Sequence, residues 1–289
     1  MIFLKILITG SSGFCGTFLK NFFQKYNSNK IISLSRKKED GNHIVFDLKN
    51  PIPDELISEK IDCIIHCASV VDEKNNEYSI LENNIRLAYN IQDFVKRKNP
   101  KHLINFSSIS VYGVPNSSNI DESFIPKPVS VYGLSKLLTE QLFEATIPKI
   151  SSLVNLRLGY ILGPKIPSRY AFSRLNNLLK NNQPISLINP DSTRFPFIDI
   201  HDIAKICEKI LETNLAGTFN VVSDTAPTLR ESFNLIKNLH PHYNNVINEN
   251  ENPKTEFSTS FSNKKIKQSG VSFKDYSQSF KEIFTCDAK

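Results

Sequence analysis

Residues 6–16, Ile-Leu-Ile-Thr-Gly-Ser-Ser-Gly-Phe-Cys-Gly, decide the fold that this sequence predicts. The apolar run from Ile2 to Ile8, interrupted only by Lys5, predicts a strand buried on both faces. Three glycines at three-residue spacing follow, and an amphipathic helix is expected over 14–26. A helix N-terminus after a glycine turn attracts phosphate, because its free N–H groups and dipole favour an anion. The stretch therefore predicts dinucleotide binding.

The glycines of this stretch are expected to have separate functions. Gly10 makes the tight turn, Gly13 lets the backbone approach a pyrophosphate, and Gly16 lets the helix pack closely on the strand. Any tight turn between a strand and a helix can require glycine, so the spacing alone is weak evidence. The strand and helix expected on either side strengthen the interpretation.

The end of the second expected strand, residues 30–35, indicates which cofactor is bound. A fold that prefers NAD places an acidic residue there for the ribose hydroxyls. This chain instead has Ser35-Arg36-Lys37-Lys38, with no acid until Glu39. A hydroxyl and a guanidinium suit a 2′-phosphate, so we expect NADP, with NAD as the alternative. A solvent-exposed basic turn would give the same sequence.

The composition of the 289 residues is that of an ordinary globular protein, with 40% hydrophobic and 22% charged residues. This length allows one large domain or one and a half. No apolar run approaches the roughly 20 residues that span a membrane, and the residues before Gly10 are interpreted as a strand rather than a signal peptide. A cytoplasmic protein without a membrane segment is therefore expected.

Charge and cysteine content argue against nucleic-acid binding and against a metal site. The net charge is +6, but the lysines are scattered and no basic run exceeds Arg36-Lys37-Lys38. The five cysteines are odd in number, and several fall in expected core elements, which is typical of free thiols. Alternation along a strand separates Cys63 and Cys67 from His66, so no metal site is expected.

Apolar and amphipathic segments alternate along the first 160 residues, which is typical of a parallel sheet with right-handed crossovers. We predict an α/β fold: a doubly wound parallel Rossmann sheet with a smaller C-terminal α/β lobe for substrate. The cofactor domain is assigned to 1–162 with 196–223, and the substrate lobe to 163–195 and 224–289. Strands are expected over 30–35, 43–48, 62–69, 101–107, 153–157, 185–188 and 217–222, helices over 77–98, 132–146, 170–180, 202–212 and 275–284, a further helix after Thr228, and a loop over 244–254.

Two polar stretches indicate the chemistry. Ser107-Ser108-Ile109-Ser110-Val111-Tyr112-Gly113 stands at the C-terminal end of an expected strand, where open α/β sheets bind ligands. Tyr132 and Lys136 lie four residues apart, on one face of the next helix. An ammonium close to a phenol favours the phenolate, while a serine hydroxyl can orient a substrate oxygen. The combination indicates proton transfer at an alcohol or carbonyl, coupled to hydride transfer at nicotinamide.

In this combination the chain resembles the extended short-chain dehydrogenase/reductase superfamily, and within it the NAD(P)-dependent epimerase/dehydratase group that modifies sugar nucleotides. The resemblance covers nearly the whole chain and is specific to the superfamily, not to a substrate. The matching motifs are Thr-Gly-x-x-Gly-x-x-Gly at 9–16, Asp-Leu at 47–48, His-x-Ala at 66–68, Asn at 84, Ser-Ser-x-x-Val-Tyr-Gly at 107–113, Tyr-Gly-x-Ser-Lys at 132–136, and three later landmarks at 157–164, 197–204 and 217–220.

The resemblance implies a role for each matching position. Ser108, Tyr132 and Lys136 would form the catalytic set, and the tyrosine and lysine would also touch the cofactor. Asn84 would support the active site by hydrogen bonding. A homodimer through the helices at 77–98 and 130–147 is implied as well. The positions implied to contact the cofactor are Gly10, Gly13, Phe14, Cys15, Gly16, Arg36, Asp47, Leu48, Ala68 and Asn84.

Three departures from the group's pattern bear on the reaction. The group's 4,6-dehydratases carry an Asp-Glu pair where this chain has Ile109 and Ser110, so sugar dehydration is not expected. The Asn that often positions a nucleotide sugar is replaced by Tyr160. An arginine that many members direct at the diphosphate falls at Phe195, with Arg194 one position earlier.

The expected activity is that of an NADP(H)-dependent oxidoreductase acting on a keto or hydroxyl carbon of a sugar nucleotide, of the 4-ketoreductase type. One alternative is a sugar-nucleotide 4-epimerase with tightly bound NAD. Another is a reductase of a non-sugar ketone, which the replacements at Tyr160 and Phe195 keep open. A cofactor-sensing module without catalysis is a fourth hypothesis, against which the complete set of Ser108, Tyr132 and Lys136 argues.

Overall fold

The computed structural model describes residues 4–26, 29–38, 43–71, 77–115, 117–146, 150–168, 170–240, 242, 244–252 and 259–285. The start of the first expected strand, Glu39, the last residue of the helix expected over 130–147, and the end of the expected loop over 244–254 lie outside these residues. Within the described ranges, no helix combines the length and the apolar character needed to cross a membrane.

The chain divides into two compact units. Unit 1 comprises residues 1–113, 124–158 and 204–219, and unit 2 comprises 114–123, 159–203 and 220–289. The units follow from packing density along the chain. The assignment of 1–162 with 196–223 to the cofactor and of the remainder to the substrate concerns function, and it stays a prediction.

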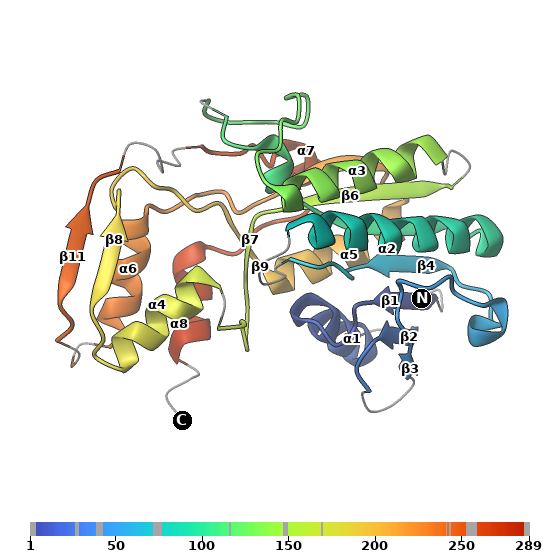
Figure 1. The fold of residues 1–289 in the computed structure, drawn as a ribbon, viewed down its shortest axis with the longest axis horizontal. Helices are drawn as coiled ribbons and strands as arrows, with labels where there is room; N and C mark the ends of the chain where they lie inside the picture. The colour runs from blue at the N-terminus through green and yellow to red at the C-terminus, as the bar shows by residue number, and fades with distance from the viewer. Residues whose placement is uncertain are drawn as a thin grey trace. The chain divides into compact units, whose positions relative to one another are not determined.

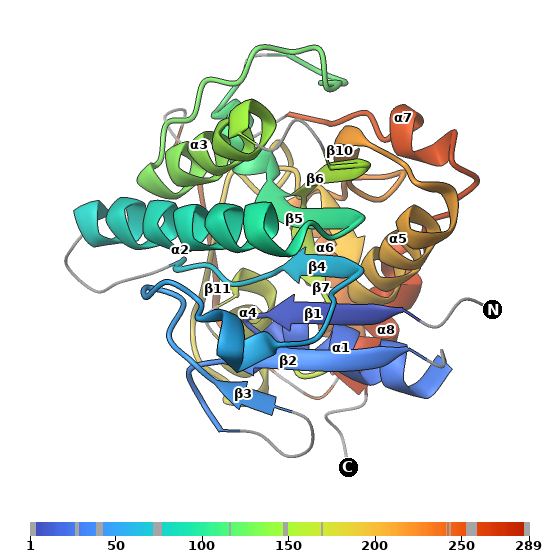
Figure 2. The same cartoon turned by 90° about the vertical axis from the view of Figure 1, so that its right-hand side faces the viewer.

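A seven-stranded sheet is the framework of unit 1, and its strand order is β10-β6-β5-β4-β1-β2-β3 (Figure 1 and Figure 2). Every neighbouring pair from β6 to β3 is parallel. After β3 the chain returns past β1 to add β4, so the winding direction changes between β1 and β4. This confirms the doubly wound α/β class. The strands are β1 (Lys5–Thr9), β2 (Lys30–Ser35), β3 (His43–Val45), β4 (Cys63–His66), β5 (His102–Ser108), β6 (Ser152–Leu158) and β10 (Gly217–Val221).

Helices cover the sheet of unit 1 on both faces, as a doubly wound sheet requires. Figure 2 shows α2 (Glu77–Lys98) and α3 (Val131–Thr146) in front of the strands, and α1 (Phe14–Tyr26) behind them. The face under α2 and α3 is a continuous apolar core in which Leu7, Ile64 and Leu103 of three adjacent strands meet Ile91 and Phe94 of α2. Strand β1 is buried from Ile6 to Thr9, which confirms the two-sided burial expected of its apolar run.

Unit 2 contains two small parallel sheets. Strand β7 (Tyr160–Leu162) pairs with β9 (Phe197–Asp199), and β8 (Ile185–Ile188) pairs with β11 (Ile247–Asn250). Their core is strongly aromatic, with Phe172, Phe197 and Phe280 in mutual edge-to-face contact at centroid distances from 4.9 to 5.4 Å. The helices are α4 (Ala171–Lys180), α6 (Leu229–Asn238), α7 (Lys264–Lys267) and α8 (Tyr276–Thr285), while α5 (Ile200–Thr213) begins in unit 2 and continues in unit 1.

Most predicted elements are found within one or two residues of their expected limits, but the strand expected over 62–69 ends at His66, and two further exceptions have identifiable causes. The third strand ends at Val45 instead of Leu48, because the chain turns at Asp47. Strand β11 occupies part of the segment 244–254. The prediction of a loop over this whole segment is therefore wrong. Its sequence, Ile-Asn-Glu-Asn, has one apolar residue, so only the pairing with β8 makes it a strand.

Candidate active site

The turn between β1 and α1 has the geometry that its glycines predict. Gly10 has a φ of +67° and donates its N–H to the Leu34 carbonyl over 2.9 Å. A Cβ at this position would also lie 2.8 Å from the Cα of Ala68. A Cβ on Gly16 would overlap the Gly10 carbonyl oxygen, so only glycine allows α1 to begin this close to the turn.

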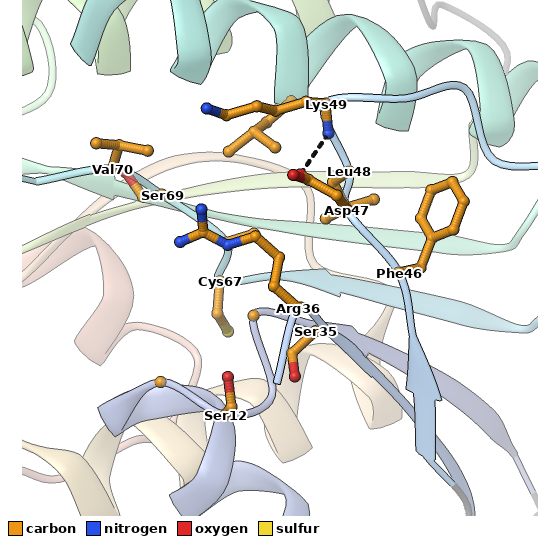
Figure 3. A pocket seen from close by; sticks show the side chains of 14 residues that line it. Ser12, Ser35, Arg36, Phe46, Asp47, Leu48, Lys49, Cys67, Ser69 and Val70 are labelled. Carbon is orange, nitrogen blue, oxygen red and sulfur yellow. Dashed lines mark hydrogen bonds between the residues drawn. The ribbon is translucent and has the colours of Figure 1, made fainter. Parts of the chain in front are cut away.

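A pocket of about 170 Å³ opens beside this turn (Figure 3). The guanidinium of Arg36 points into it, toward Ser69 and Val70. The Asp47 carboxylate accepts a 3.0 Å hydrogen bond from the backbone N–H of Lys49. The lining residues are Gly10, Ser12, Gly13, Ser35, Arg36, Phe46, Asp47, Leu48, Lys49, Cys67, Ala68, Ser69, Val70 and Leu87.

This lining brings together six of the positions implied to bind a cofactor: Gly10, Gly13, Arg36, Asp47, Leu48 and Ala68. Phe14, Cys15, Gly16 and Asn84 do not line it. The pocket also contains residues that the sequence reasoning missed, among them Ser12 and Lys49. Ser12 lies inside the glycine motif at 9–16, and Lys49 directly follows the Asp-Leu motif at 47–48. These positions were the signal that could have identified the two residues.

The pocket suits the adenosine part of a dinucleotide. Gly10 and Gly13 of the turn line it, and so do two cationic residues, Arg36 and Lys49. The Ser11 hydroxyl in the adjacent turn is buried and has no hydrogen-bond partner among the described residues. A polar turn with an unsatisfied hydroxyl at a helix N-terminus fits a phosphate group.

Asn84 lies outside the pocket and fixes the segment that follows β4. Its side-chain oxygen accepts from the Val70 N–H over 2.7 Å, and its Nδ2 donates to the Val70 carbonyl over 2.9 Å. Nδ2 also donates to the Ser135 hydroxyl over 2.9 Å. Asn84 therefore ties the pocket wall to helix α3, in line with a supporting role.

Lys136 projects from α3 to the end of β5. Its Nζ donates a hydrogen bond to the Phe106 carbonyl over 2.8 Å and lies 5.7 Å from the ring centre of Tyr132. The Lys136 side chain is 5% exposed, and this burial lowers its pKa to about 8, although Cys67, Cys15 and Glu140 act in the opposite direction. A fraction of the lysine is therefore neutral slightly above neutral pH.

Ser108 ends β5 and begins the short 3-10 turn Ile109–Tyr112. Its Oγ accepts from the Ser110 N–H over 3.1 Å and donates to the Ser110 hydroxyl over 3.0 Å. Helix α3 approaches this turn closely. A Cβ on Gly133 would overlap the Ser110 carbonyl oxygen, so glycine is required at this position. Ser108, Tyr132 and Lys136 thus come from adjoining backbone segments of unit 1.

His66 and the neighbouring Cys67 have surroundings that suit a structural role. His66 is buried and shares a 2.9 Å hydrogen bond with the Thr9 hydroxyl. Burial, assisted by the charge of Lys136, lowers the pKa of His66 to about 3, so the ring stays neutral. Burial raises the pKa of the Cys67 thiol. No group of three or more potential metal ligands occurs in the part of the chain that the structure describes.

Two of the departures noted in the sequence lie together in unit 2. Tyr160 is 46% exposed as a residue, and its ring makes an edge-to-face contact with Phe195, with 5.2 Å between centroids. Arg194 is also exposed, and its Nη1 donates to the Ala226 carbonyl over 2.9 Å. Tyr160 and Phe195 therefore form an aromatic contact at the two positions where the group's pattern has an asparagine and an arginine.

The glycine turn, the pocket at the change of winding direction and the Tyr-Lys pair define an NAD(P)-dependent enzyme with a Rossmann fold. The chain belongs to the NAD dependent epimerase/dehydratase family, whose sequence profile matches residues 6–222. This family is the group that the sequence motifs resemble, and the match confirms that expectation.

Individual relatives are similar at a low level of identity. GDP-6-deoxy-D-talose 4-dehydrogenase of Aggregatibacter actinomycetemcomitans is 26% identical over 250 residues, which cover 83% of this chain and 81% of the relative. The crystal structure of UDP-N-acetylglucosamine 4-epimerase from Bacillus cereus is 25% identical, with a TM-score of 0.85 over 99% of this chain and 100% of the other. RMD from Pseudomonas aeruginosa, solved with NADPH, is 19% identical, has a TM-score of 0.84 over 98% of each chain, and supports the fold.

Proposed function

We propose that the protein is an NADP(H)-dependent oxidoreductase that interconverts a keto and a hydroxyl group on the sugar of a sugar nucleotide. The observation that carries this proposal is the position of Lys136, whose buried ammonium donates to the Phe106 carbonyl at the end of β5 and lies 5.7 Å from the centre of the Tyr132 ring. This is an arrangement for proton transfer to a substrate oxygen. The sugar-nucleotide substrate is supported by the names of the relatives.

The cofactor would be held by the pocket beside the glycine turn. Gly10 and Gly13 leave the backbone accessible to the pyrophosphate, and Asp47 and Leu48 line the space for adenosine. Arg36 supports NADP over NAD, because a guanidinium pairs with a 2′-phosphate and the position lacks the carboxylate that would repel it. When bound, the nicotinamide supplies or accepts the hydride.

In the reductive direction, the residues of this chain deliver the proton. The Tyr132 hydroxyl donates its proton to the carbonyl oxygen of the substrate while that oxygen gains negative charge. The Ser108 hydroxyl turns from Ser110 and donates a hydrogen bond to the same oxygen. The Lys136 ammonium stabilises the Tyr132 phenolate, which regains a proton from solvent. The substrate gains one hydride and one proton and leaves as the alcohol.

A sugar-nucleotide 4-epimerase with retained NAD is the second candidate, and the similarity to the Bacillus cereus epimerase favours it. The same tyrosine would then first remove and later return the proton, with no net consumption of cofactor. A reductase of a non-sugar ketone is favoured by the aromatic contact between Tyr160 and Phe195. Dehydration is disfavoured, because Ile109 and Ser110 supply no carboxyl group beside Ser108.

We also propose a homodimer formed through α2 and α3. Two tyrosines of α2, Tyr78 and Tyr89, are 85% and 60% exposed and lie eleven residues apart, which places them on one side of the helix. Leu134 on α3 is a further exposed apolar residue. Large exposed side chains on long helices favour an interface between subunits.

Analysis of the purified protein separates the two main candidates. Bound nucleotide is released by denaturation and identified, and NADPH and NADH are titrated against stripped protein by fluorescence. The proposal predicts little retained nucleotide and tighter binding of NADPH. Stoichiometric NAD that survives purification would contradict it and favour the epimerase.

A further inference from the structure

A buried ion pair lies beneath the proposed catalytic residues. Arg157 of β6 donates from Nη2 to the Glu140 Oε2 over 2.8 Å and from Nε to Oε1 over 3.1 Å. Glu140 is 2% exposed and Arg157 is 6% exposed. A pair this deeply buried is poor evidence for stabilisation, because both charges lose their hydration.

Each partner of the pair makes a further hydrogen bond, and the two hydrogen bonds lie on either side of the turn, one at the end of β5 and one at the last residue of the turn. Glu140 accepts a hydrogen bond from the hydroxyl of Ser107, the residue before Ser108. Arg157 donates from Nη1 to the Tyr112 hydroxyl over 2.8 Å, and its guanidinium lies 4.8 Å from the centre of that ring. Tyr112 is the last residue of the turn Ile109–Tyr112.

Glu140 also belongs to the helix face that carries the proposed chemistry. Tyr132, Lys136 and Glu140 follow one another at four-residue spacing on α3, so they lie in one row. The Lys136 ammonium contacts the Phe106 carbonyl and Glu140 contacts Ser107, so one row of α3 holds two consecutive residues of β5.

We infer that the Glu140–Arg157 pair is a positioning element that holds the chain on both sides of Ser108, at Ser107 in β5 and at Tyr112 at the end of the turn, and thereby sets the location of the Ser108 hydroxyl. The inference rests on the proposed role of Ser108 in catalysis. A hydroxyl misplaced by about 1 Å can reduce a rate by roughly 10²-fold, so a rigid turn has catalytic value. Tyr112 and Ser107 act through the turn and touch no reacting atom.

The test uses Tyr112→Phe, because removal of either charge would leave its partner buried and unpaired. This variant removes only the hydroxyl that accepts from Arg157. Asn105→Ala is the matched control. It breaks a buried 2.8 Å hydrogen bond to Asn155 between the same two strands, and among the described residues the Asn105 side chain makes no hydrogen bond to the turn.

Two measurements are made on the full-length protein. Hydrogen exchange of the peptide that contains residues 107–113 should be faster in Tyr112→Phe and unchanged in Asn105→Ala. With an active substrate, Tyr112→Phe should lower kcat about tenfold with the Kd of NADPH changed less than about twofold, whereas Asn105→Ala should keep the wild-type kcat. In the Ser108→Ala background, Tyr112→Phe should have no further effect on kcat, because both changes act on one hydroxyl.

Each result decides a separate point. Unchanged exchange over 107–113 would overturn the proposed restraint of the turn. Faster exchange with an unchanged kcat, or a full tenfold effect in the Ser108→Ala background, would overturn the positioning role. A wild-type protein that turns over no sugar nucleotide or ketone would contradict the proposed function, and the exchange data would still decide whether the ion pair holds the turn.

Discussion

Lys136 donates a hydrogen bond from its buried ammonium to the main-chain carbonyl of Phe106 over 2.8 Å. This contact joins the helix that carries Tyr132 to the strand that ends at Ser108. It also places a cation where water has little access, and burial lowers the pKa of Lys136 to about 8. The protonation of one lysine therefore links the geometry of the site to pH.

The pH profile of kcat/KM should have an alkaline limb near pH 8. The ammonium form of Lys136 supports Tyr132, and it is lost as the pH rises through about 8, so the rate should fall about tenfold per pH unit above this value. In Lys136→Arg the guanidinium stays charged, so that limb should disappear even though the rate is lower. A wild-type profile that is flat to pH 10 would contradict the role of this lysine.

The stability of the protein should rise with pH over the same range. Lys136 has a pKa of about 8 in the folded chain, against about 10.4 in an unfolded chain, so the unfolded state binds more protons between these values. The resulting gain in the free energy of unfolding is absent below pH 8 and complete above about pH 10.4. Urea unfolding at pH 7.5 and 9.5 gives the free energy of unfolding of the wild type and of Lys136→Met. This free energy should increase with pH in the wild type by an amount that the variant lacks. An equal change of the unfolding free energy with pH in the two proteins would show that Lys136 keeps an ordinary pKa.

Arg36→Ala should weaken NADPH and leave NADH nearly unchanged. Loss of a hydrogen bond to a charged group costs about 1.5–3 kcal/mol, so the Kd of NADPH should rise roughly ten- to hundredfold. Lys38→Ala is the control, since Lys38 is also exposed and basic but does not line the pocket. Fluorescence titration of both cofactors measures the four affinities. Equal losses of NADPH and NADH affinity would mean that Arg36 does not bind the 2′-phosphate.

Gly16→Ala should destabilise the protein and prevent cofactor binding. The added Cβ would overlap the Gly10 carbonyl, so helix α1 must shift, at a cost of about 1–3 kcal/mol. Gly270→Ala is a useful comparison, because its Cβ would meet no atom within 4 Å while its φ of +87° still imposes strain. Chemical denaturation and NADPH titration should show normal binding only in Gly270→Ala. Tight cofactor binding by Gly16→Ala would refute the close-packing argument.

Tyr89→Glu should convert the proposed homodimer to a monomer. The tyrosine is 60% exposed on α2, and a carboxylate at a subunit interface would lose its hydration without a partner. Val246→Glu is the control, because Val246 is similarly exposed, at 62%, and belongs to unit 2. Sedimentation velocity gives the mass of each protein. A monomeric wild type would exclude the dimer.

Local pattern was sufficient to predict the fold because its strands are buried on both faces and its helices are amphipathic. The run before Gly10 is an example, with β1 buried from Ile6 to Thr9. Pairing between distant segments was not predictable in this way. Strand β11 has a single apolar residue, and its conformation depends on contacts with Ile185–Ile188, some sixty residues earlier.

The candidate site was predictable to the extent that it consists of motifs. Gly10, Arg36 and Asp47 line one pocket as their sequence context implied. The ion pair of Glu140 and Arg157 was not anticipated, because helix and strand contribute one charge each and no spacing rule connects them. The four-residue interval from Lys136 to Glu140 was one signal, but it is equally typical of a solvent-exposed helix face. The position of Arg157 at the start of the landmark 157–164 was another, but it did not identify the partner of the arginine.

The central claim is that Tyr132 transfers the proton in an NADPH-consuming reaction. The most direct test incubates wild type and Tyr132→Phe with NADPH and a panel of 4-keto sugar nucleotides, and measures NADPH consumption against product. The account predicts one NADPH oxidised for each hydroxyl formed by the wild type, and a rate lower by about 10²-fold or more in Tyr132→Phe, with unchanged NADPH affinity. Equal turnover by the two proteins, or conversion of a sugar nucleotide to its epimer with no NADPH consumed, would contradict it.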